Sequence, residues 1–355
     1  MRVLVLCKYG RLGASSRLRS LQYLPWLEQV GMTCVVSPLL SDYQVEHLYT
    51  AGRYPLASLF RSYTRRVRSL LSRRQFDVVW IEKEALPWLP AWFERQLLRD
   101  VPYVLDYDDA IFHNYDQHSS WAVRKLLGCK LDRLMARADL VTVGNDYLAD
   151  RAVRAGSRRV EIVPTVIDLE RYPLRVRTEA STGEVVVGWI GSPATAKYLE
   201  MVSEVLNRLC LRHRMRCVAI GAREDQLVGT PFRPAPWHED TEVSSLCGLD
   251  IGIMPLPDAP WERGKCGYKL IQYMGCSLPV VASPVGVNRQ IVRNGENGFL
   301  ADSEVQWEEC LERLIVDASL RARMGAAGRE RVEQEFCLQV QGPRLARMLR
   351  ELGSG

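Results

Sequence analysis

The sequence predicts an α/β protein of two Rossmann-like domains, each built on a parallel sheet, that face a central cleft. Three observations support this fold class. Short apolar runs alternate with amphipathic stretches along most of the chain, as in parallel sheets whose strands are joined by helices. The pattern stops in a polar stretch at residues 175–183 and then restarts. The length of 355 residues is large for one core and fits two domains.

The first half of the chain supplies six expected strands. They are Val3–Cys7, Thr33–Ser37, Asp77–Ile81, Tyr103–Asp106, Leu140–Val143 and Val160–Pro164. The intervening periodicity predicts helices at Leu18–Gln29, Trp88–Leu98, Arg124–Ala136 and Tyr147–Ala155. We therefore expect an N-terminal domain at residues 1–174, followed by a linker at 175–183.

The second half repeats the alternation and predicts a C-terminal domain at residues 184–337. Its expected strands are Val185–Ile190, Cys217–Ile220, Ile251–Met254, Pro279–Ala282 and Gly298–Leu300. Helices are expected at Ala196–His213 and Tyr268–Met274, and from Val305 onward with a break near Gly325–Gly328. Open α/β sheets bind ligands at the carboxyl ends of their strands, which places the expected site in the cleft.

Composition and cysteine usage indicate a cytoplasmic protein. Apolar residues make up 47% of the chain and charged residues 25%, as in ordinary soluble domains. The first apolar run is too short for a signal peptide, and no apolar stretch approaches the ~20 residues that span a bilayer. The ten cysteines form no Cys-x-x-Cys pair, which favours free thiols in a reducing compartment.

A basic segment at residues 59–74 has two interpretations. Six arginines alternate there with apolar residues at helical spacing, which gives an apolar stripe beside a cationic face. The helix either covers the sheet with a solvated outer face or rests on anionic lipid at the inner face of the plasma membrane. Nucleic acid is not expected as a partner, because no known binding motif accompanies the patch.

The loop after the first strand, Lys8–Arg17, is the first candidate ligand segment. Gly10 and Gly13 allow close approach of backbone, and a helix beginning near Ser16 offers free N–H groups. The Gly-x-x-Gly spacing does not match the dinucleotide fingerprint, so a nicotinamide site is disfavoured. A plain strand-to-helix turn and a ligand loop both remain open.

The second segment is an acidic cluster, Asp106, Asp108 and Asp109, at the end of the fourth strand. Three acids in four residues repel one another when they lose water, so they indicate a bound ligand, a helix cap or a metal. No companion acid or histidine cluster is visible for a metal, so none is expected. We favour a catalytic or acceptor-binding role for Asp108 or Asp109.

Two further segments in the second half combine glycines with cations. Gly191 and Ser192 open the turn after its first strand, and Lys197 follows in the next helix. A later loop carries Arg263, Lys265 and Lys269 among glycines and leads into a helix. Backbone amides at helix N-termini together with cations suit a diphosphate. Gln272, one turn beyond Lys269, can hydrogen-bond a ribose hydroxyl.

Taken together, these segments resemble the family-4 retaining glycosyltransferases of the GT-B fold. The resemblance covers nearly the whole chain and is most specific in the loop, helix and Pro-Val-Val-Ala-Ser strand at residues 264–283. It also includes Gly191-Ser192 with Lys197, the Ala14–Arg17 loop, and Val163-Pro164 with Asp168. It implies a C-terminal helix, residues 338–355, that crosses back to the first domain.

The resemblance implies roles at matching positions. Gly267, Tyr268 and Lys269 would contact the donor pyrophosphate and sugar, with Gly191, Ser192, Lys197, Arg263 and Lys265 completing the donor site and Gln272 at the ribose. Gly13, Ser16 and Arg17 are expected to contact the acceptor. Lys269 is expected to be catalytic, and so are Asp109 and Asp108, on the strength of the acidic cluster and not of the family, whose histidine role cannot be transferred. The chain departs from the family in its Glu-x7-Glu pair, which falls on Gly264 and Gln272, although Glu262 lies nearby. Where many members have a histidine in the first domain, Asp108 and Asp109 stand instead.

The activity implied is hexosyl transfer from a nucleotide-diphosphate sugar to a saccharide or lipid-linked acceptor, with retention of anomeric configuration, in cell-surface polysaccharide biosynthesis. Neither a cofactor nor a divalent cation is expected. Two alternatives remain open. One is a non-catalytic sugar-nucleotide binding protein, which the missing glutamates permit. The other is a different two-lobed α/β enzyme, such as a sugar-nucleotide epimerase or an NAD-dependent dehydrogenase.

Overall fold

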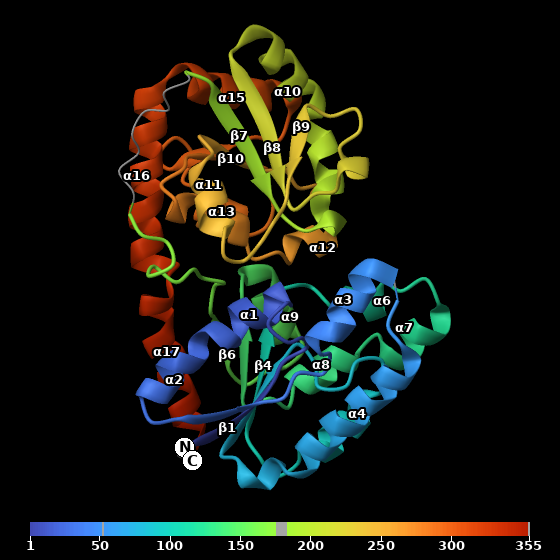
Figure 1. Cartoon of the computed structure of the whole chain (residues 1–355). Coiled ribbons are helices and arrows are strands. Elements are labelled where there is room, and N and C mark those ends of the chain that lie inside the picture. Colours follow the sequence, from blue (N-terminus) through green and yellow to red (C-terminus); the bar gives the residue numbers. More distant parts are fainter. Residues whose placement is uncertain (52, 175–182, 354–355) are drawn as a thin grey trace. The chain divides into compact units, whose positions relative to one another are not determined.

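The computed structural model describes residues 1–51, 53–174 and 183–353 and divides into two compact units (Figure 1). The first comprises Met1–Thr165, Arg263–Cys266 and Leu338–Gly355, and the second Val166–Glu262 and Gly267–Cys337. Each unit contains one six-stranded sheet whose paired strands all run parallel, which confirms the predicted class of two α/β domains. The expected linker lies, apart from Gly183, outside the described residues.

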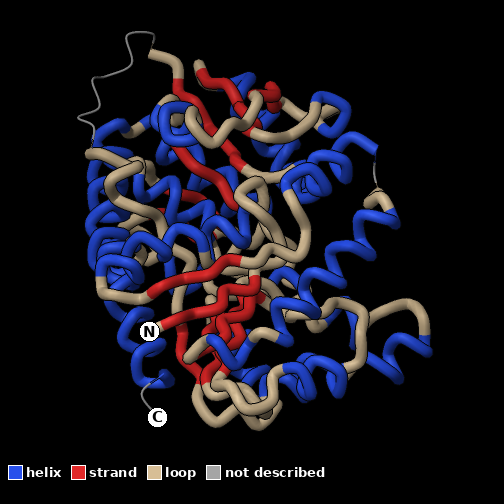
Figure 2. Tube along the Cα trace, turned by 60° about the horizontal axis from the view of Figure 1, so that its bottom comes forward, coloured by secondary structure: helices blue, strands red, loops and turns tan. Residues whose placement is uncertain are grey.

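The first sheet has the order β2-β1-β3-β4-β5-β6. Its strands are β1 Arg2–Leu6, β2 Thr33–Val36, β3 Val78–Glu82, β4 Tyr103–Tyr107, β5 Leu140–Val143 and β6 Val160–Ile162. The three strands β3, β4 and β5 are buried at every position, whereas the edge strands β2 and β6 are partly exposed. Helices surround this sheet, as Figure 2 shows. Burial on both faces explains the continuous apolar runs of the inner strands.

Two helices predicted in the first unit are each divided in the structure. Leu18–Gln29 becomes α1 Ala14–Arg19, a 3₁₀ turn η1 Leu21–Tyr23, and α2 Leu24–Gln29, which begins anew with a proline in its first turn. Arg124–Ala136 becomes α7 Trp121–Leu127 and α8 Lys130–Met135. The other helices of the unit are α3 Asp42–Ala51, α4 Leu56–Leu71, η2 Arg73–Gln75, α5 Ala91–Leu97, α6 His113–Asp116, α9 Asp146–Arg154 and α17 Leu338–Gly353.

Helix α4 does not simply turn an apolar stripe inward. Its buried residues are Ser62, Arg66 and Leu70. The Arg66 guanidinium donates to the carbonyl of Ser37 at 3.0 Å and to that of Cys7. Leu56 and Phe60, by contrast, are 83% and 76% exposed. One of the predicted surface cations is therefore internal, and part of the apolar side faces solvent.

The final helix α17 packs within the first unit. The Cα of Gly342 approaches the indole of Trp26 so closely that a Cβ there would lie 3.0 Å from a ring atom. Arg344 bonds Glu161 at 3.0 Å. The N-terminal unit is thus completed by the last described stretch of the chain. No helix among the described residues is both long and apolar enough to cross a membrane.

The second sheet has the order β12-β11-β10-β7-β8-β9. Its strands are β7 Val185–Ile190, β8 Met215–Ile220, β9 Phe232–Ala235, β10 Ile251–Met254, β11 Val280–Ala282 and β12 Gly298–Leu300. Strand β9 was not predicted. It is an edge strand that contains Pro234, and a proline within a short run weakens the sequence signal for a strand.

The second unit contains the remaining helices. They are η3 Pro193–Leu199, α10 Glu200–Arg212, η4 Glu224–Gln226, α11 Glu242–Cys247, α12 Pro260–Arg263, α13 Tyr268–Gly275, α14 Asn288–Ile291, α15 Glu304–Val316 and α16 Ala318–Glu335, although Arg263 itself is grouped with the first unit. The predicted break near Gly325–Gly328 is wrong, because α16 continues through both glycines. A Cβ at Gly325 would lie 2.0 Å from the carbonyl oxygen of Ser277, so this glycine permits close packing after α13.

Candidate functional site

The acidic cluster of the first unit separates into three side chains with different partners. Asp106, in β4, is buried and takes two hydrogen bonds from Arg19, at 2.9 Å from Nε and 2.6 Å from Nη2. The hydroxyl of Thr142 donates to the same carboxylate at 2.6 Å. Asp106 and Arg19 therefore form a buried bidentate pair that ties α1 to the sheet, and neither ion is turned outward.

Asp108 belongs to a compact group with Lys83 and Ser15. The Lys83 Nζ lies 2.9 Å from Asp108 Oδ1 and donates to Ser15 Oγ at 2.6 Å, and the Ser15 hydroxyl donates to Asp108 Oδ2 at 2.6 Å. Burial alone would raise the pKa of Asp108, but the charges of Lys83 and Arg19 outweigh it and lower the pKa to about 2. Asp108 is thus held as a carboxylate.

Asp109 lies in a different environment although it is the next residue. Its side chain is 30% exposed, and its Oδ1 lies 3.6 Å from Lys265 Nζ. Burial and the neighbouring charge of Asp108 raise the pKa of Asp109 above its ordinary value, against the opposing charge of Lys265. Two adjacent carboxyl groups with pKa values displaced in opposite directions are typical of sites where one acid fixes charge and the other handles a proton.

Lys265 reaches Asp109 because residues 263–266 pack onto the first unit. Asn145 Nδ2 donates to the carbonyl of Lys265 at 2.9 Å, and the Cys266 thiol donates to the carbonyl of Asp108 at 2.8 Å. A Cβ on Gly264 would lie 2.5 Å from that of Ala110, so this position requires a glycine. The structure therefore groups Arg263 and Lys265, which were predicted at the donor, with the acidic cluster.

Sequence reasoning missed the residues that follow β3. Glu82 pairs with Asp106 in the register of the sheet, and Lys83 comes next with a φ of 66° and only 5% exposure. A buried cation in left-handed backbone is strained and persists only where surrounding contacts hold it. The available signal was the Glu-Lys-Glu run directly after an apolar strand, at the edge where ligands bind in parallel sheets.

Residues of the loop after β1 make buried contacts next to the group of Asp108, Lys83 and Ser15. Ser16 is buried, donates to Glu82 and accepts from the backbone N–H of Tyr9 at 2.9 Å. Arg17 is 7% exposed and donates to the carbonyl of Arg11 at 3.1 Å. A Cβ on Gly13 would lie 2.2 Å from that of Tyr9. These three predicted acceptor residues shape the loop, whereas Ser15 is the one that contacts Asp108.

In the second unit, two of the predicted segments meet at the carboxyl end of β7. Lys269 Nζ lies 5.3 Å from the centre of the Trp189 ring. A Cβ on Gly191 would lie 2.5 Å from that ring and 2.9 Å from Lys269 Cε. Because Gly191 has no side chain, it leaves space for the Trp189 ring and the Lys269 side chain. The ammonium group of Lys269 therefore lies near the turn that follows β7.

The following 3₁₀ turn is joined to the later loop through a buried hydrogen bond. Tyr198 donates its hydroxyl proton to Glu262, which is 8% exposed. Lys197 is exposed, with its Nζ 5.3 Å from the centre of the Tyr198 ring, and Ser192 is exposed at the start of the turn. Glu262 is thus a buried acceptor for the hydroxyl of Tyr198.

Helix α13 is preceded by a backbone conformation that only glycine adopts easily. Gly267 caps it with a φ of 64°, and a Cβ there would also lie 2.3 Å from a methyl of Ile291. Tyr268 and Lys269 are the first two residues of the helix. Backbone N–H groups of this first turn have no partner within the helix and favour an anion.

Gln272 lies deeper in the same helix, in a buried polar network. It is 3% exposed and donates to the hydroxyl of Tyr172 at 3.1 Å. Tyr172 donates to Glu242 Oε1 at 3.0 Å, and the indole of Trp237 donates to Glu242 Oε2 at 2.8 Å. The amide predicted to hold a ribose therefore has a protein partner on its donor side.

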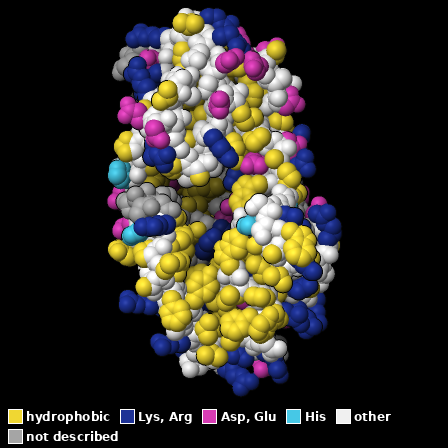
Figure 3. Space-filling model, turned by 90° about the vertical axis from the view of Figure 1, so that its right-hand side faces the viewer, with side chains coloured by type: hydrophobic (Ala, Val, Ile, Leu, Met, Phe, Trp, Pro, Cys, Tyr) yellow, Lys and Arg dark blue, Asp and Glu magenta, His cyan; other side chains and the backbone are white. Residues whose placement is uncertain are grey.

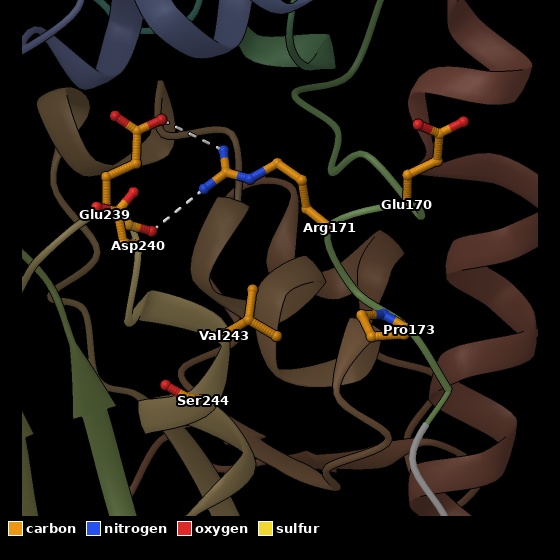
Figure 4. Close-up of a pocket in the computed structure, with 7 residues that line it drawn as sticks. All are labelled: Glu170, Arg171, Pro173, Glu239, Asp240, Val243 and Ser244. Carbon is orange, nitrogen blue, oxygen red and sulfur yellow. Dashed lines mark hydrogen bonds and ion pairs between the residues drawn. The ribbon is translucent and has the colours of Figure 1, made fainter.

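A shallow pocket of the second unit lies outside these groups (Figure 4). It is lined by Glu170, Arg171, Pro173, Glu239, Asp240, Val243 and Ser244. Arg171 turns toward Glu239, with Nη1 3.6 Å from its carboxylate. None of the predicted site residues lines it. Within the described ranges, no group of three or more His, Cys, Asp or Glu residues is arranged to hold a metal.

Comparison with known families finds a match to each half of the chain. Residues 5–165 match the family described as "Glycosyl transferase 4-like domain". Residues 184–317 match the family described as "Glycosyl transferases group 1". The two matches together include the acidic cluster, the Gly191 turn and helix α13.

Individual relatives are more distant. The D-inositol 3-phosphate glycosyltransferase of Stackebrandtia nassauensis is 24% identical over 229 residues, which are 55% of this chain and 50% of that protein. The capsular polysaccharide biosynthesis glycosyltransferase CapM of Staphylococcus aureus is 30% identical over 105 residues, which are 29% of this chain and 26% of that protein. The chain spans about half the length of the first curated relatives that it matches.

Solved structures match along the full chain. Sucrose-phosphate synthase from Thermosynechococcus elongatus superposes with a TM-score of 0.74 at 14% identity, over 100% of this chain and 99% of that one. Anabaena HepE in complex with UDP-glucose gives 0.73 at 16% identity, over 99% and 100% of the two chains. WaaG, a glycosyltransferase involved in lipopolysaccharide biosynthesis, gives 0.70 at 14% identity, over 98% and 99%. At such identities the likeness shows the fold.

Proposed function

This chain belongs to the family-4 glycosyltransferases of the GT-B fold, and on that premise we propose that it transfers a hexosyl group from a nucleotide-diphosphate sugar to a saccharide or lipid-linked acceptor. We further propose retention of anomeric configuration and a role in cell-surface polysaccharide biosynthesis. The observation that carries the proposal is the meeting of Lys269, Gly191 and the start of α13 at the carboxyl end of β7.

The second unit is proposed to bind the donor. Cleaving the bond to the anomeric carbon leaves negative charge on the diphosphate, so a useful site stabilises that charge as it develops. Lys269, Lys197 and the N–H groups that follow Gly267 supply positive charge and donors there. Ser192 adds a hydroxyl, and the Gln272–Tyr172 pair is proposed to support the ribose end.

The first unit is proposed to bind the acceptor. Asp109 is partly exposed and has a raised pKa, which suits a group that orients an acceptor hydroxyl and shares its proton. Lys83 and Ser15 keep Asp108 ionised and fixed beside it. Neither carboxylate is assigned as a covalent nucleophile, because front-face transfer within an ion pair needs none.

Further parts of the proposal concern conditions and location. We propose that transfer requires neither a cofactor nor a divalent cation, which chelation with EDTA tests directly. We propose a cytoplasmic location with peripheral contact at the inner face of the plasma membrane through the region around 59–74.

The test is a screen of nucleotide sugars by thermal shift, followed by an assay of nucleotide release. Lys269→Ala should lower donor use at least about tenfold, because one charge-assisted contact to phosphate is lost. Arg323→Ala removes an exposed cation of the second unit, in α16, and serves as the control. Unchanged kinetics for Lys269→Ala would contradict the donor site. Donor affinity without nucleotide release, for any acceptor tried, would favour the binding-protein alternative that Gly264 and Gln272 leave open.

A further inference from the structure

The first unit exposes an unusual group of large apolar side chains. Trp88, Trp92 and Trp121 are 53%, 63% and 65% exposed, and Leu126 is 69% exposed. Single exposed apolar residues are common, but several large aromatics on one unit mark a surface that another phase or molecule covers. Neither the acidic cluster nor the donor residues include any of them.

We call these exposed side chains, together with Leu56 and Phe60 of α4, the aromatic surface: Leu56, Phe60, Trp88, Trp92, Trp121 and Leu126. Contacts link the segments that carry them. Tyr63 of α4 donates to the carbonyl of Pro87 at 2.9 Å, which fixes α4 beside Trp88. The Trp88 ring lies 5.8 Å from that of His118, whose carbonyl accepts from Arg124 of α7.

The space-filling view shows the same gathering. Hydrophobic side chains, several of them ring-shaped, collect over the face of the first unit that carries α4 and α7, with Lys and Arg side chains along the border (Figure 3). Helix α4 packs against α5, which begins one residue before Trp92. Helices α4 and α5, which carry Phe60 and Trp92, therefore lie side by side.

The charged residues of α4 and α7, the helices that carry Leu56, Phe60, Trp121 and Leu126, are all basic. Residues 47–76 contain seven arginines and no acid, and residues 117–131 contain Arg124, Lys125 and Lys130 and no acid. The arginines are Arg53, Arg61, Arg65, Arg66, Arg68, Arg73 and Arg74. The carboxylates of Glu84 and Glu94 nearby are buried, and both are paired with Lys130. Arg66 and Lys130 are buried, and Arg74 pairs with Asp100 at 3.0 Å. The exposed cations of α4 and α7 are Arg61, Arg65, Arg68, Arg124 and Lys125.

We propose that the aromatic surface docks into the interfacial region of a bilayer that contains anionic lipid. Tryptophan is enriched at the boundary between headgroups and acyl chains, where its ring is apolar and its N–H remains hydrated. Lys and Arg at the same level attract anionic headgroups. Protein interfaces are also enriched in tryptophan and arginine, so the test below includes a second copy of the chain as an outcome that would overturn the proposal.

The proposal differs from a basic helix lying flat on lipid. Because Arg66 is internal, α4 contributes Leu56 and Phe60, and Arg61 and Arg68 are exposed on the same helix. The tryptophans come from the loop before α5, from α5 itself and from α7. The inference deepens the proposed function, and rests on it only in taking a membrane-borne acceptor as the reason for docking.

The experiment is cosedimentation of the full chain with vesicles, without any nucleotide sugar. One set contains phosphatidylcholine alone and the other equal parts of phosphatidylcholine and phosphatidylglycerol. We expect binding to the anionic vesicles, weaker binding to the neutral ones, and loss of binding as salt is raised. A blue shift of tryptophan fluorescence on binding should accompany it. Absence of binding to both vesicle types would overturn the proposal.

Paired variants separate the apolar and charged contributions. Trp92→Ser/Trp121→Ser should lower the partition coefficient at least about tenfold, whereas Leu211→Ser/Val228→Ser, at residues of the second unit that are 88% and 83% exposed, should leave it unchanged. Arg61→Gln/Arg68→Gln should lower it about fivefold per arginine, and Arg214→Gln/Arg323→Gln is the charge-matched control. Thermal melting of each variant verifies folding.

Three outcomes would count against the aromatic surface. Equal binding by the tryptophan pair and the wild type would show that another region contacts lipid. Equal effects of variants and controls would show only a dependence on net charge or hydrophobicity. A dimer detected by light scattering that the tryptophan variant dissolves, with no vesicle binding, would identify a second copy as the occupant. Because no donor is present, none of these results depends on whether sugar transfer occurs.

Discussion

At the scale of single residues, Asp108 and Asp109 are neighbours with opposite electrostatics. Lys83 and Ser15 bind Asp108 and stabilise its ionised form. Burial and the charge of Asp108 instead disfavour the ionised form of Asp109. A one-residue step along the chain therefore separates a carboxylate whose pKa is lowered from a carboxyl group whose pKa is raised. The sequence shows the two aspartates, but only the folded chain shows that Lys83 pairs with Asp108 and Lys265 with Asp109.

Asp109→Asn should reduce sugar transfer about 100-fold, the usual contribution of a positioned acid or base, with donor binding nearly unchanged. Nucleotide release and isothermal titration with the donor measure the two effects. Asp150→Asn, at an exposed aspartate of α9, is the control. A collapse of nucleotide affinity in Asp109→Asn would instead assign this acid to the donor site or to the fold.

The same substitution should alter stability with a definite sign. The pKa of Asp109 is raised in the folded state, so the folded chain binds this proton more tightly than the unfolded chain does. Stability from this group is present at low pH and is lost as pH rises from the ordinary aspartate pKa through the raised value. Asp109→Asn should therefore gain stability relative to wild type as pH rises from 4 to 7, as measured by urea unfolding. A constant difference across that range would contradict the raised pKa.

Lys83→Met should destabilise the first unit by about 3–5 kcal/mol, because it leaves the buried Asp108 without its cation. Urea unfolding followed by circular dichroism measures this loss. Adding Asp108→Asn to the same chain should recover part of it, since the uncompensated charge is then removed. If the double variant is as unstable as the sum of the two single ones, Lys83 acts mainly through packing or through its left-handed backbone.

At the scale of elements, apolar runs located most strands, and the errors have physical reasons. The edge strand β9 lacks a continuous apolar run because it contains Pro234. The glycines of α16 suggested a break because glycine weakens an isolated helix. Tertiary packing overrides that preference, since the helix approaches the backbone at Ser277 where only glycine fits.

Gly325→Ala should test this packing. Its Cβ would lie 2.0 Å from a backbone carbonyl oxygen, which cannot move aside easily, so we expect a loss of about 1–3 kcal/mol. Gly328→Ala is matched in helix and chemistry, but its Cβ would lie 2.9 Å from the flexible side chain of Met274. It should cost less, and it gains the helix propensity of alanine. Thermal unfolding compares the two, and equal effects would argue against close packing at Gly325.

At the scale of the whole molecule, the alternation of strands and helices predicted both parallel sheets and the glycine-rich turns at their carboxyl ends. It could not predict that residues 263–266 join the first unit, because that depends on contacts with Asn145 and Asp108 that are more than a hundred residues distant. For the same reason the sequence could not predict that Lys265, expected at the diphosphate, lies beside Asp109. Local motifs indicate which residues have functional side chains, whereas long-range packing determines which of these side chains lie next to one another.

The proposed division of labour predicts where a donor nucleotide stabilises the chain. A ligand that binds only the folded second unit stabilises it by about 2.7 kcal/mol at one hundred times its dissociation constant. Hydrogen exchange with the nucleoside diphosphate that binds best should therefore slow at the turn after β7 and at the start of α13, while amides near Ser15 and Lys83 change little. In Lys269→Ala the same concentration should protect these amides less, because a phosphate contact is gone. Protection confined to the loop after β1 would instead assign the nucleotide to the first unit, and the cations around Gly191 would then need another ligand.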